Sequence, residues 1–127
     1  MPEAVFRIRQ LRKRRVSGAT AFCLEIPDLT IQAGERLVLT GASGSGKSTL
    51  LDVLAMVLSV DSAETFAFAP PDQPVHDLLA LWRCGALDAF TGLRRRYFGY
   101  VLQGGGLLGF LTVRDNITLP RRWCELP

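Results

Sequence analysis

The chain has 127 residues, which is room for one domain with one hydrophobic core. Its composition, 48% hydrophobic and 21% charged residues, excludes an intrinsically disordered chain. The formal net charge of +3 is modest, and two short arginine-rich clusters at 12–15 and 94–96 are interpreted as solvated surface, so no nucleic-acid partner is expected.

The first predicted elements are two short strands. Residues 5–11 partly alternate between apolar and polar side chains, which predicts an edge strand, and residues 21–26 alternate again. The basic cluster and the glycine between them, residues 12–18, are interpreted as a turn. Pro27 is expected to end the second strand.

A glycine-rich motif follows, between a predicted strand and a predicted helix. Residues 36–40 are a short, mostly apolar run, typical of a buried parallel strand. Residues 49–58 are largely apolar and have the length of a buried helix. Between them, Gly41 to Ser48 match G-x-x-x-x-G-K-[ST], the phosphate-binding P-loop. A flexible Gly/Ser linker is the alternative, but the close apolar flanks argue against it.

The residue types of this motif suit phosphate chemistry. Glycines let successive backbone N–H groups point into one concavity at the start of a helix. Lys47 can reach the β- and γ-phosphates, and the Ser48 hydroxyl can bind Mg²⁺. The predicted nucleotide-binding residues are Gly41, Ser43, Gly44, Ser45, Gly46, Lys47, Ser48 and Thr49.

One further strand and a broken helix are predicted after the P-loop helix. Residues 65–69 form a strand candidate that the proline-rich residues 70–74 interrupt. Residues 77–93 are predicted to be partly helical, with Asp77 as a candidate N-cap and a break at Gly85.

The last predicted elements flank a flexible loop. Residues 98–102 are predicted to form a strand that ends at Gln103, before three consecutive glycines. A capping box at 112–115 predicts the start of a helix, which Pro120 is expected to end. The order of all elements predicts an α/β fold with a mixed sheet.

Several segments together resemble one family. The residues are 33–35, the P-loop and its extension to Leu51, the turn at 61–64, the approach to Gln103 at 95–103, and residues 107–117. In this combination the chain resembles the nucleotide-binding subunit of an ABC transporter. The ending Thr118-Leu119-Pro120 is similar to the lipoprotein-release and macrolide-export branch.

The resemblance implies a P-loop NTPase fold, with a RecA-like core and an N-terminal antiparallel β layer, in incomplete form. Residues 1–127 would be a partial ABC-type nucleotide-binding domain that runs through the Q-loop and into the start of the helical subdomain. The sequence contains no Leu-Ser-Gly-Gly-Gln signature, no Walker B strand and no switch histidine. We therefore expect ATPase activity of the ABC type in a full-length form and not in this chain alone.

The resemblance also implies cofactors and site roles. ATP and Mg²⁺ are the expected cofactors, with Ser48 and Gln103 as metal ligands and Gln103 as the sensor of the γ-phosphate and water. The family usually stacks adenine on an aromatic residue upstream of the P-loop. The expected stretch, 15–18, has none, which leaves Phe22 as the candidate.

The implied partners are a transmembrane permease subunit and a second nucleotide-binding subunit. The implied location is cytoplasmic, at the inner face of the cell membrane. This agrees with the expectations of no signal peptide, since the first residues lack its pattern, and of no spanning segment, since Asp52 interrupts the longest apolar stretch. The scattered residues Cys23, Cys84 and Cys124 fit reduced thiols, and His76 is interpreted as a surface residue.

Two other functions stay open from the sequence. A small P-loop kinase would need an arginine-rich lid, for which residues 94–96 could serve. A non-catalytic nucleotide-binding or docking fragment would need no water-activating carboxylate.

Overall fold

A long antiparallel hairpin forms the N-terminal part of the molecule. The computed structural model describes residues 3–124, and in it β1 (Ala4–Ser17) pairs with β2 (Thr20–Gln32). The turn between them consists of Gly18 and Ala19, and the φ of 59° at Gly18 is the left-handed conformation that a tight hairpin turn requires. The two predicted strands are confirmed, and both are longer than predicted.

The basic cluster lies within β1 and not in a turn, so that prediction was wrong. The backbone pairing of the hairpin continues through it, and charged partners neutralise part of it. Arg12 lies 3.3 Å from the Glu25 carboxylate and Lys13 lies 3.2 Å from that of Asp61. The prediction that Pro27 ends the second strand was also wrong. Strand β2 lies at the edge of the sheet and has one neighbouring strand, so a proline without an N–H is tolerated there.

The hairpin is part of a four-stranded sheet with the order β2-β1-β3-β4. Strand β3 (Thr65–Phe68) pairs with β1, and β4 (His76–Asp77) pairs with β3, all antiparallel. The predicted strand at 65–69 is therefore confirmed. The two-residue strand β4 was not predicted, and it is too short to leave a periodic pattern in the sequence.

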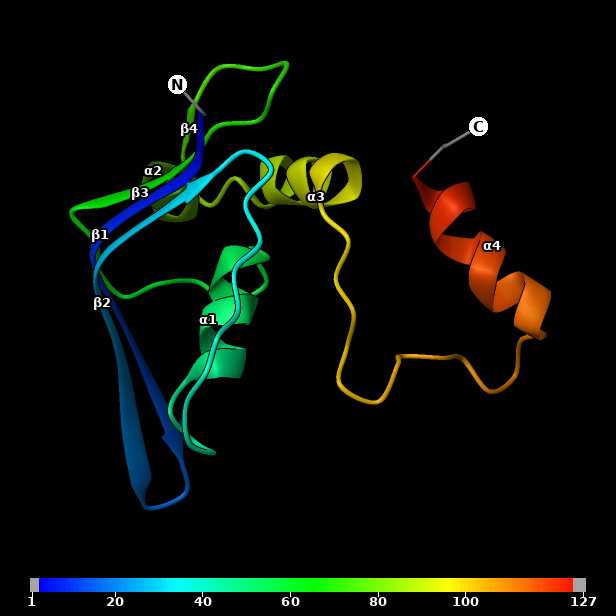
Figure 1. Ribbon diagram of the computed structural model, residues 1–127, viewed down its shortest axis with the longest axis horizontal. Coiled ribbons are helices and arrows are strands. Elements are labelled where there is room, and N and C mark those ends of the chain that lie inside the picture. The colour runs from blue at the N-terminus through cyan, green and yellow to red at the C-terminus, as the bar shows by residue number, and fades with distance from the viewer. Residues whose placement is uncertain (1–2, 125–127) are drawn as a thin grey trace.

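Three helices, one between β2 and β3 and two after β4 in the chain, cover one face of the sheet (Figure 1). They are α1 (Lys47–Leu54), α2 (Leu78–Arg83) and α3 (Leu87–Tyr97). The Asp77 carboxylate accepts the N–H of Ala80 and caps α2, and the break at Gly85 is confirmed. Helix α1 ends earlier than predicted because Met56 takes a φ of 58° and turns the chain.

The hydrophobic core lies between the sheet and these helices. The sheet contributes Phe6, Ile8, Leu11, Phe66 and Phe68, and the helices contribute Val53, Leu78, Leu79, Phe90 and Leu93, with Met56 and Val60 after α1. Side chains alternate along each strand, so the hydrophobic members share the face that the helices cover. The predicted α/β class and the N-terminal antiparallel layer are confirmed.

Two predicted strands are not formed. Residues 36–40 and 98–102 have no strand pairing in the structure, and the sheet of residues 3–124 is antiparallel rather than mixed. Most of their apolar side chains are exposed, Val38 by 82% and Val101 by 88%, whereas Phe98 is half-buried against Phe6 and Phe68. A parallel strand requires a neighbour brought from far away in the sequence, and these segments have none among the described residues.

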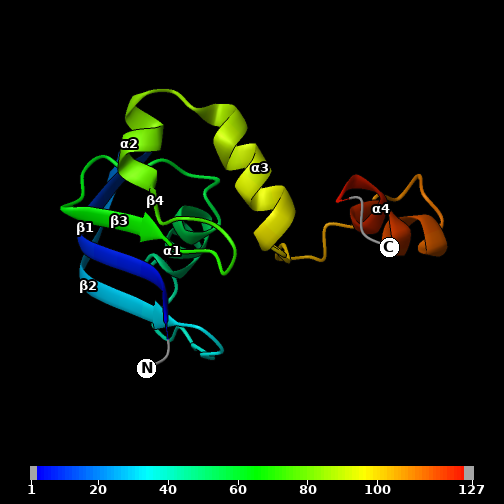
Figure 2. The ribbon, with the colours of Figure 1, turned by 90° about the horizontal axis from the view of Figure 1, so that it is seen from above.

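The last helix, α4 (Val113–Trp123), lies apart from the sheet (Figure 2). The predicted cap is confirmed, since the Thr112 hydroxyl accepts the N–H of Asp115 at 3.1 Å. The expected end at Pro120 was wrong. Proline removes one hydrogen bond, and the helix continues for one more turn, in which Cys124 donates to the Pro120 carbonyl at 2.9 Å. None of the helices described is long and apolar enough to cross a bilayer.

Candidate nucleotide-binding site

The glycine-rich loop leads directly into α1. Gly46 is the N-cap of this helix and has a φ of 99°, a conformation that residues with a Cβ rarely adopt. A Cβ on Gly46 would lie 2.6 Å from Cζ of Phe22, so the ring of Phe22 already occupies that space. Two constraints, backbone conformation and close packing, therefore require glycine at this position.

The loop wraps around the ammonium group of Lys47. Its Nζ donates to the carbonyl oxygens of Gly41 and Ala42, at 2.8 and 2.7 Å, and to the Ser45 hydroxyl at 3.3 Å. A Cβ on Gly41 would lie 2.7 Å from the Ser45 hydroxyl oxygen, so a side chain there would displace that hydroxyl from the Lys47 ammonium. The positive charge of Lys47 is thus held at the loop.

A cleft of about 650 Å³ opens beside this loop. That volume lies within the range of small-molecule sites. The residues lining it are Arg15, Thr20, Phe22, Ser43, Gly44, Gly46, Lys47, Ser48, Thr49 and Gln103. Six of the eight predicted nucleotide-binding residues therefore share one cleft, and the other two, Gly41 and Ser45, contact the Lys47 ammonium instead.

Gln103 reaches the same cleft from a distant part of the chain. Three residues before it, the Tyr100 hydroxyl donates to the Asp52 carboxylate of α1 at 2.6 Å. This bond ties the segment that contains Gln103 to the helix that follows the P-loop. The hydrogen bond to the carboxylate, helped by partial desolvation, raises the pKa of Tyr100, which keeps the hydroxyl protonated as the donor.

Two residues of the cleft were missed by the sequence analysis. They are Arg15 and Thr20, which flank the hairpin turn and line the cleft together with the P-loop, and the turn end of the hairpin lies near the start of α1 (Figure 1). The sequence analysis searched residues 15–18 only for an aromatic ring, so it passed over Arg15. The signal that could have found it is the hairpin register, because a two-residue turn at Gly18 and Ala19 places Arg15 directly opposite Phe22.

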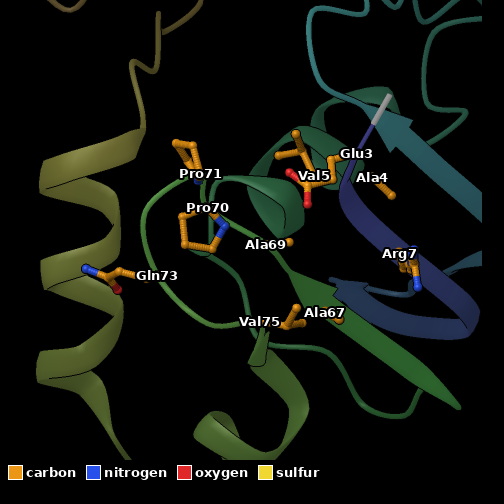
Figure 3. A pocket seen from close by; sticks show the side chains of 10 residues that line it. All are labelled: Glu3, Ala4, Val5, Arg7, Ala67, Ala69, Pro70, Pro71, Gln73 and Val75. Carbon is orange, nitrogen blue, oxygen red and sulfur yellow. The ribbon is translucent and has the colours of Figure 1, made fainter. Parts of the chain in front are cut away.

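A second cavity, of about 260 Å³, lies on the other face of the sheet (Figure 3). Its walls are the outward side chains of β1 and β3 and the loop after β3. The lining residues are Glu3, Ala4, Val5, Arg7, Ala67, Ala69, Pro70, Pro71, Gln73 and Val75. No sequence motif falls in this cavity, so the cleft beside the P-loop is the better candidate for function.

Comparison with curated proteins finds similar sequences over most of the chain. A macrolide export ATP-binding/permease protein of Aeromonas hydrophila is 39% identical over 78% of this chain. A protein of the same description from Vibrio parahaemolyticus is 34% identical over 100% of it, and a pyoverdine export ATP-binding/permease protein of Pseudomonas aeruginosa is 34% identical over 99%. The chain spans only 14 to 18% of the length of these relatives.

The fold agrees with this similarity. A dimeric bacterial ABC transporter cassette superposes with a TM-score of 0.73 at 25% identity, over 94% of this chain and 47% of that one. This confirms the predicted P-loop NTPase fold. The sequence pattern of the ABC transporter family matches residues 24–125. With that match, and with relatives above 30% identity along its length, the chain belongs to the ABC transporter family.

Proposed function

We propose that the chain binds ATP together with Mg²⁺ in the cleft beside the P-loop, as the nucleotide-binding part of an ABC transporter. The observation that carries the proposal is the meeting of Lys47, Ser48 and Gln103 in one cleft beside the glycine-rich loop. In this proposal residues 1–127 are a partial ABC-type nucleotide-binding domain.

The loop supplies the phosphate contacts. Backbone N–H groups and the N-terminus of α1 attract negative charge, and Lys47 can exchange its carbonyl partners for phosphate oxygens. A hydrogen bond from the ammonium to a charged phosphate oxygen is stronger than the hydrogen bonds to neutral carbonyl oxygens that it replaces. Among the described residues no carboxylate lines the cleft, so nothing there repels the phosphates.

The donor set also suits magnesium. A hydroxyl on Ser48 and an amide oxygen on Gln103 are hard oxygen ligands of the kind that Mg²⁺ takes, alongside water and phosphate oxygens. When bound, Mg²⁺ would neutralise charge on the phosphates. Ser48 and Gln103 would hold it, with Gln103 placed to respond to the γ-phosphate.

The chain also presents a surface for partners. Leu107 is 77% exposed and Phe110 is 83% exposed, so these apolar side chains do not pack into the core of this chain. Exposed apolar clusters of this kind mark docking surfaces. We propose that they contact a transmembrane permease, at the cytoplasmic face of the membrane. Since the similar cassette is dimeric, we also propose a second nucleotide-binding domain as a partner.

Removal of the Lys47 ammonium tests the nucleotide proposal. Lys47→Ala should weaken ATP binding about 10- to 100-fold, because a charge-assisted phosphate contact is worth roughly 1.5–3 kcal/mol. The measurement is titration calorimetry with ATP and Mg²⁺. Arg83→Ala is the matched control, because it removes an exposed cation of α2 that is remote from the cleft lining. Equal affinity in Lys47→Ala and the control would refute the proposal.

A further inference from the structure

Small side chains create the cavity on the outer face of the sheet (Figure 3). Phe66 and Phe68 of β3 are buried on the face that the helices cover, so Ala67 between them points outward and lines the cavity. Ala4 and Ala69 line it as well. The volume of about 260 Å³ lies just below that of pockets for drug-sized molecules, so the cavity suits a smaller ligand.

An irregularity at the start of β1 brings two neighbouring residues to the cavity. The register of β1 against β2 shifts between Ala4 and Phe6, which leaves Val5 as the extra residue. In a regular strand consecutive side chains point to opposite faces, but a bulge redirects them. Ala4 and Val5 therefore both line the cavity. The Val5 carbonyl also accepts the N–H of Ala69 at 2.8 Å, which joins this wall to the end of β3.

The loop after β3 forms the opposite wall, and α3 holds it in place. Pro70 is buried, and Pro71 next to it has a backbone φ that its ring fixes. The Asp72 carboxylate accepts hydrogen bonds from the Tyr97 hydroxyl and the Arg96 guanidinium of α3. Because this wall is already ordered, it loses little conformational freedom when a ligand binds.

Two charged side chains of opposite sign line the cavity and have no partner within residues 3–124. Arg7 points outward, because its neighbours Phe6 and Ile8 are buried on the other face, and Glu3 precedes β1. Neither side chain makes a hydrogen bond or an ion pair with the described residues. A guanidinium and a carboxylate that share a cavity without contacting each other can each bind an opposite charge of one ligand.

We propose that this cavity binds a short zwitterionic peptide of the size of a dipeptide. The carboxylate of the ligand pairs with the Arg7 guanidinium, whose planar set of N–H donors matches a carboxylate. Its ammonium group pairs with the Glu3 carboxylate, and its apolar side chain packs on the alanines and prolines of the walls. The inference does not rest on the proposed nucleotide-binding function, because the cavity and the nucleotide cleft share no lining residue.

The spacing of the two charges fits a ligand of this length. Glu3 and Arg7 are four positions apart on an extended backbone, which places their Cα atoms about 13 Å apart. An extended chain of two residues spans about 7 Å, and a hydrogen bond of about 3 Å at each end accounts for the remainder. A single amino acid holds its two charges closer together and reaches both side chains less readily.

Three probes that differ in their terminal charges test the proposal. Glycyl-leucine, glycyl-leucinamide and N-acetylglycyl-leucine are titrated into the purified chain, and the amide chemical shifts of residues 65–75 are followed by NMR. Glycyl-leucine should bind most tightly. The amide lacks the carboxylate and the acetyl derivative lacks the ammonium group, so each should bind about 3- to 10-fold more weakly, as expected for one charge-assisted contact at an exposed site.

Charge and cavity variants assign each contact. Arg7→Gln should weaken the binding of glycyl-leucine and its acetyl derivative about 3- to 10-fold and leave the amide unaffected, because the amide has no carboxylate to lose. Glu3→Gln should weaken glycyl-leucine and the amide and leave the acetyl derivative unaffected. Ala67→Leu places a larger side chain in the cavity and should abolish binding of all three probes without changing the circular dichroism spectrum.

Arg9→Gln is the matched control. Arg9 is the next outward residue of β1 after Arg7, pairs with Glu64 at 3.9 Å, and is absent from the cavity lining. It removes the same charge from the same face and should leave all three probes unaffected. The proposal is overturned if wild type shows no saturable binding of glycyl-leucine, or if Arg7→Gln and Arg9→Gln weaken it equally. Losses that do not depend on which terminal charge the probe carries would also overturn it.

Discussion

The N-terminal sheet and the segments at 36–40 and 98–102 are all rich in apolar side chains, but the sheet buries most of its own, while the two segments leave most of theirs exposed. Ile8 and Leu11 of β1 are fully buried, whereas Val38 and Val101 are 82% and 88% exposed. Intrinsic preference for extended structure does not explain the difference, because all these segments contain strand-forming residues. The difference is the availability of a partner strand.

The sheet obtains its partners locally. A two-residue turn brings β2 back along β1, and β3 follows within the same antiparallel layer. The cost of closing a loop grows with its length, and parallel neighbours always require a long connection. Segments 36–40 and 98–102 have the sequence of parallel strands and find no such neighbour in the described structure. An apolar pattern thus predicts a strand only together with its pairing.

The largest expected effect tests whether stability resides in the sheet layer. Phe66 of β3 is 1% exposed and lies in the core between the sheet and the helices. Phe66→Ala should cost about 3–5 kcal/mol through lost burial and the cavity left behind. This is a large part of the stability of a small domain, so we expect most of the chain to unfold. Urea unfolding followed by circular dichroism gives the value.

Val38→Ala is the control for that measurement. It shortens an apolar side chain in residues 36–40, a segment without a partner strand. Because this side chain is exposed, the substitution should change the unfolding free energy by less than about 0.5 kcal/mol. A loss comparable with that of Phe66→Ala would show that residues 36–40 are packed in solution, and the contrast between the two regions would disappear.

The same contrast explains which predictions from sequence succeeded. Features set by neighbouring residues were predicted well: the Asp77 and Thr112 caps, the break at Gly85 and the P-loop before α1. Features set by distant residues were not. The strand at 98–102 lacks its partner, and β1 runs through its basic cluster because β2 pairs with it.

The candidate site divides in the same way. Lys47 and Ser48 follow from a contiguous motif, and Gln103 follows from its spacing and resemblance. Arg15 was missed because residues 15–18 were searched only for an aromatic ring, and its place in the cleft follows from the hairpin register.

A smaller effect is expected at the contact between residues 98–103, which pair with no strand, and helix α1, which packs against the core. The hydrogen bond from Tyr100 to Asp52 joins residues 98–103 to α1. Tyr100→Phe removes one hydrogen bond to a charged acceptor and leaves the ring, so it should loosen this segment locally and change global stability little in so exposed a setting. Amide hydrogen exchange in 98–103 should therefore accelerate several-fold, while exchange in β1 and β3 stays unchanged.

Tyr97→Phe makes the matched change in the packed region. Its hydroxyl donates to Asp72, so its removal should loosen the loop around Asp72 and not residues 98–103. If both variants accelerate exchange over the same residues, the two regions behave as one unit and the contrast is wrong.

The smallest expected effect concerns acid sensitivity of the sheet layer. Asp61 accepts the backbone N–H of Arg14 at 2.6 Å and the Lys13 ammonium at 3.2 Å. The N–H of Arg14 is the main cause of a lowered pKa at Asp61, and partial desolvation opposes it. Since the folded pKa lies below the unfolded value of 3.8, the stabilisation is complete above that pH and is lost as the pH falls through the folded value.

Asp61→Asn measures this contribution directly. The carboxylate is about half exposed, so we expect the variant to be less stable than wild type by under about 1 kcal/mol near neutral pH. The difference should shrink once the pH is below 3.8, because wild type then loses the same charge. Asp28→Asn is the control, because it neutralises an exposed carboxylate of β2 that makes no hydrogen bond among the described residues, and it should change the stability near neutral pH by less than about 0.5 kcal/mol. A difference in stability between wild type and Asp61→Asn that stays constant across pH would mean that Asp61 acts through its shape and not its charge. The hairpin would then be anchored to the turn at 61–64 by backbone hydrogen bonds alone, such as the one from the Arg12 N–H to the Ser62 carbonyl.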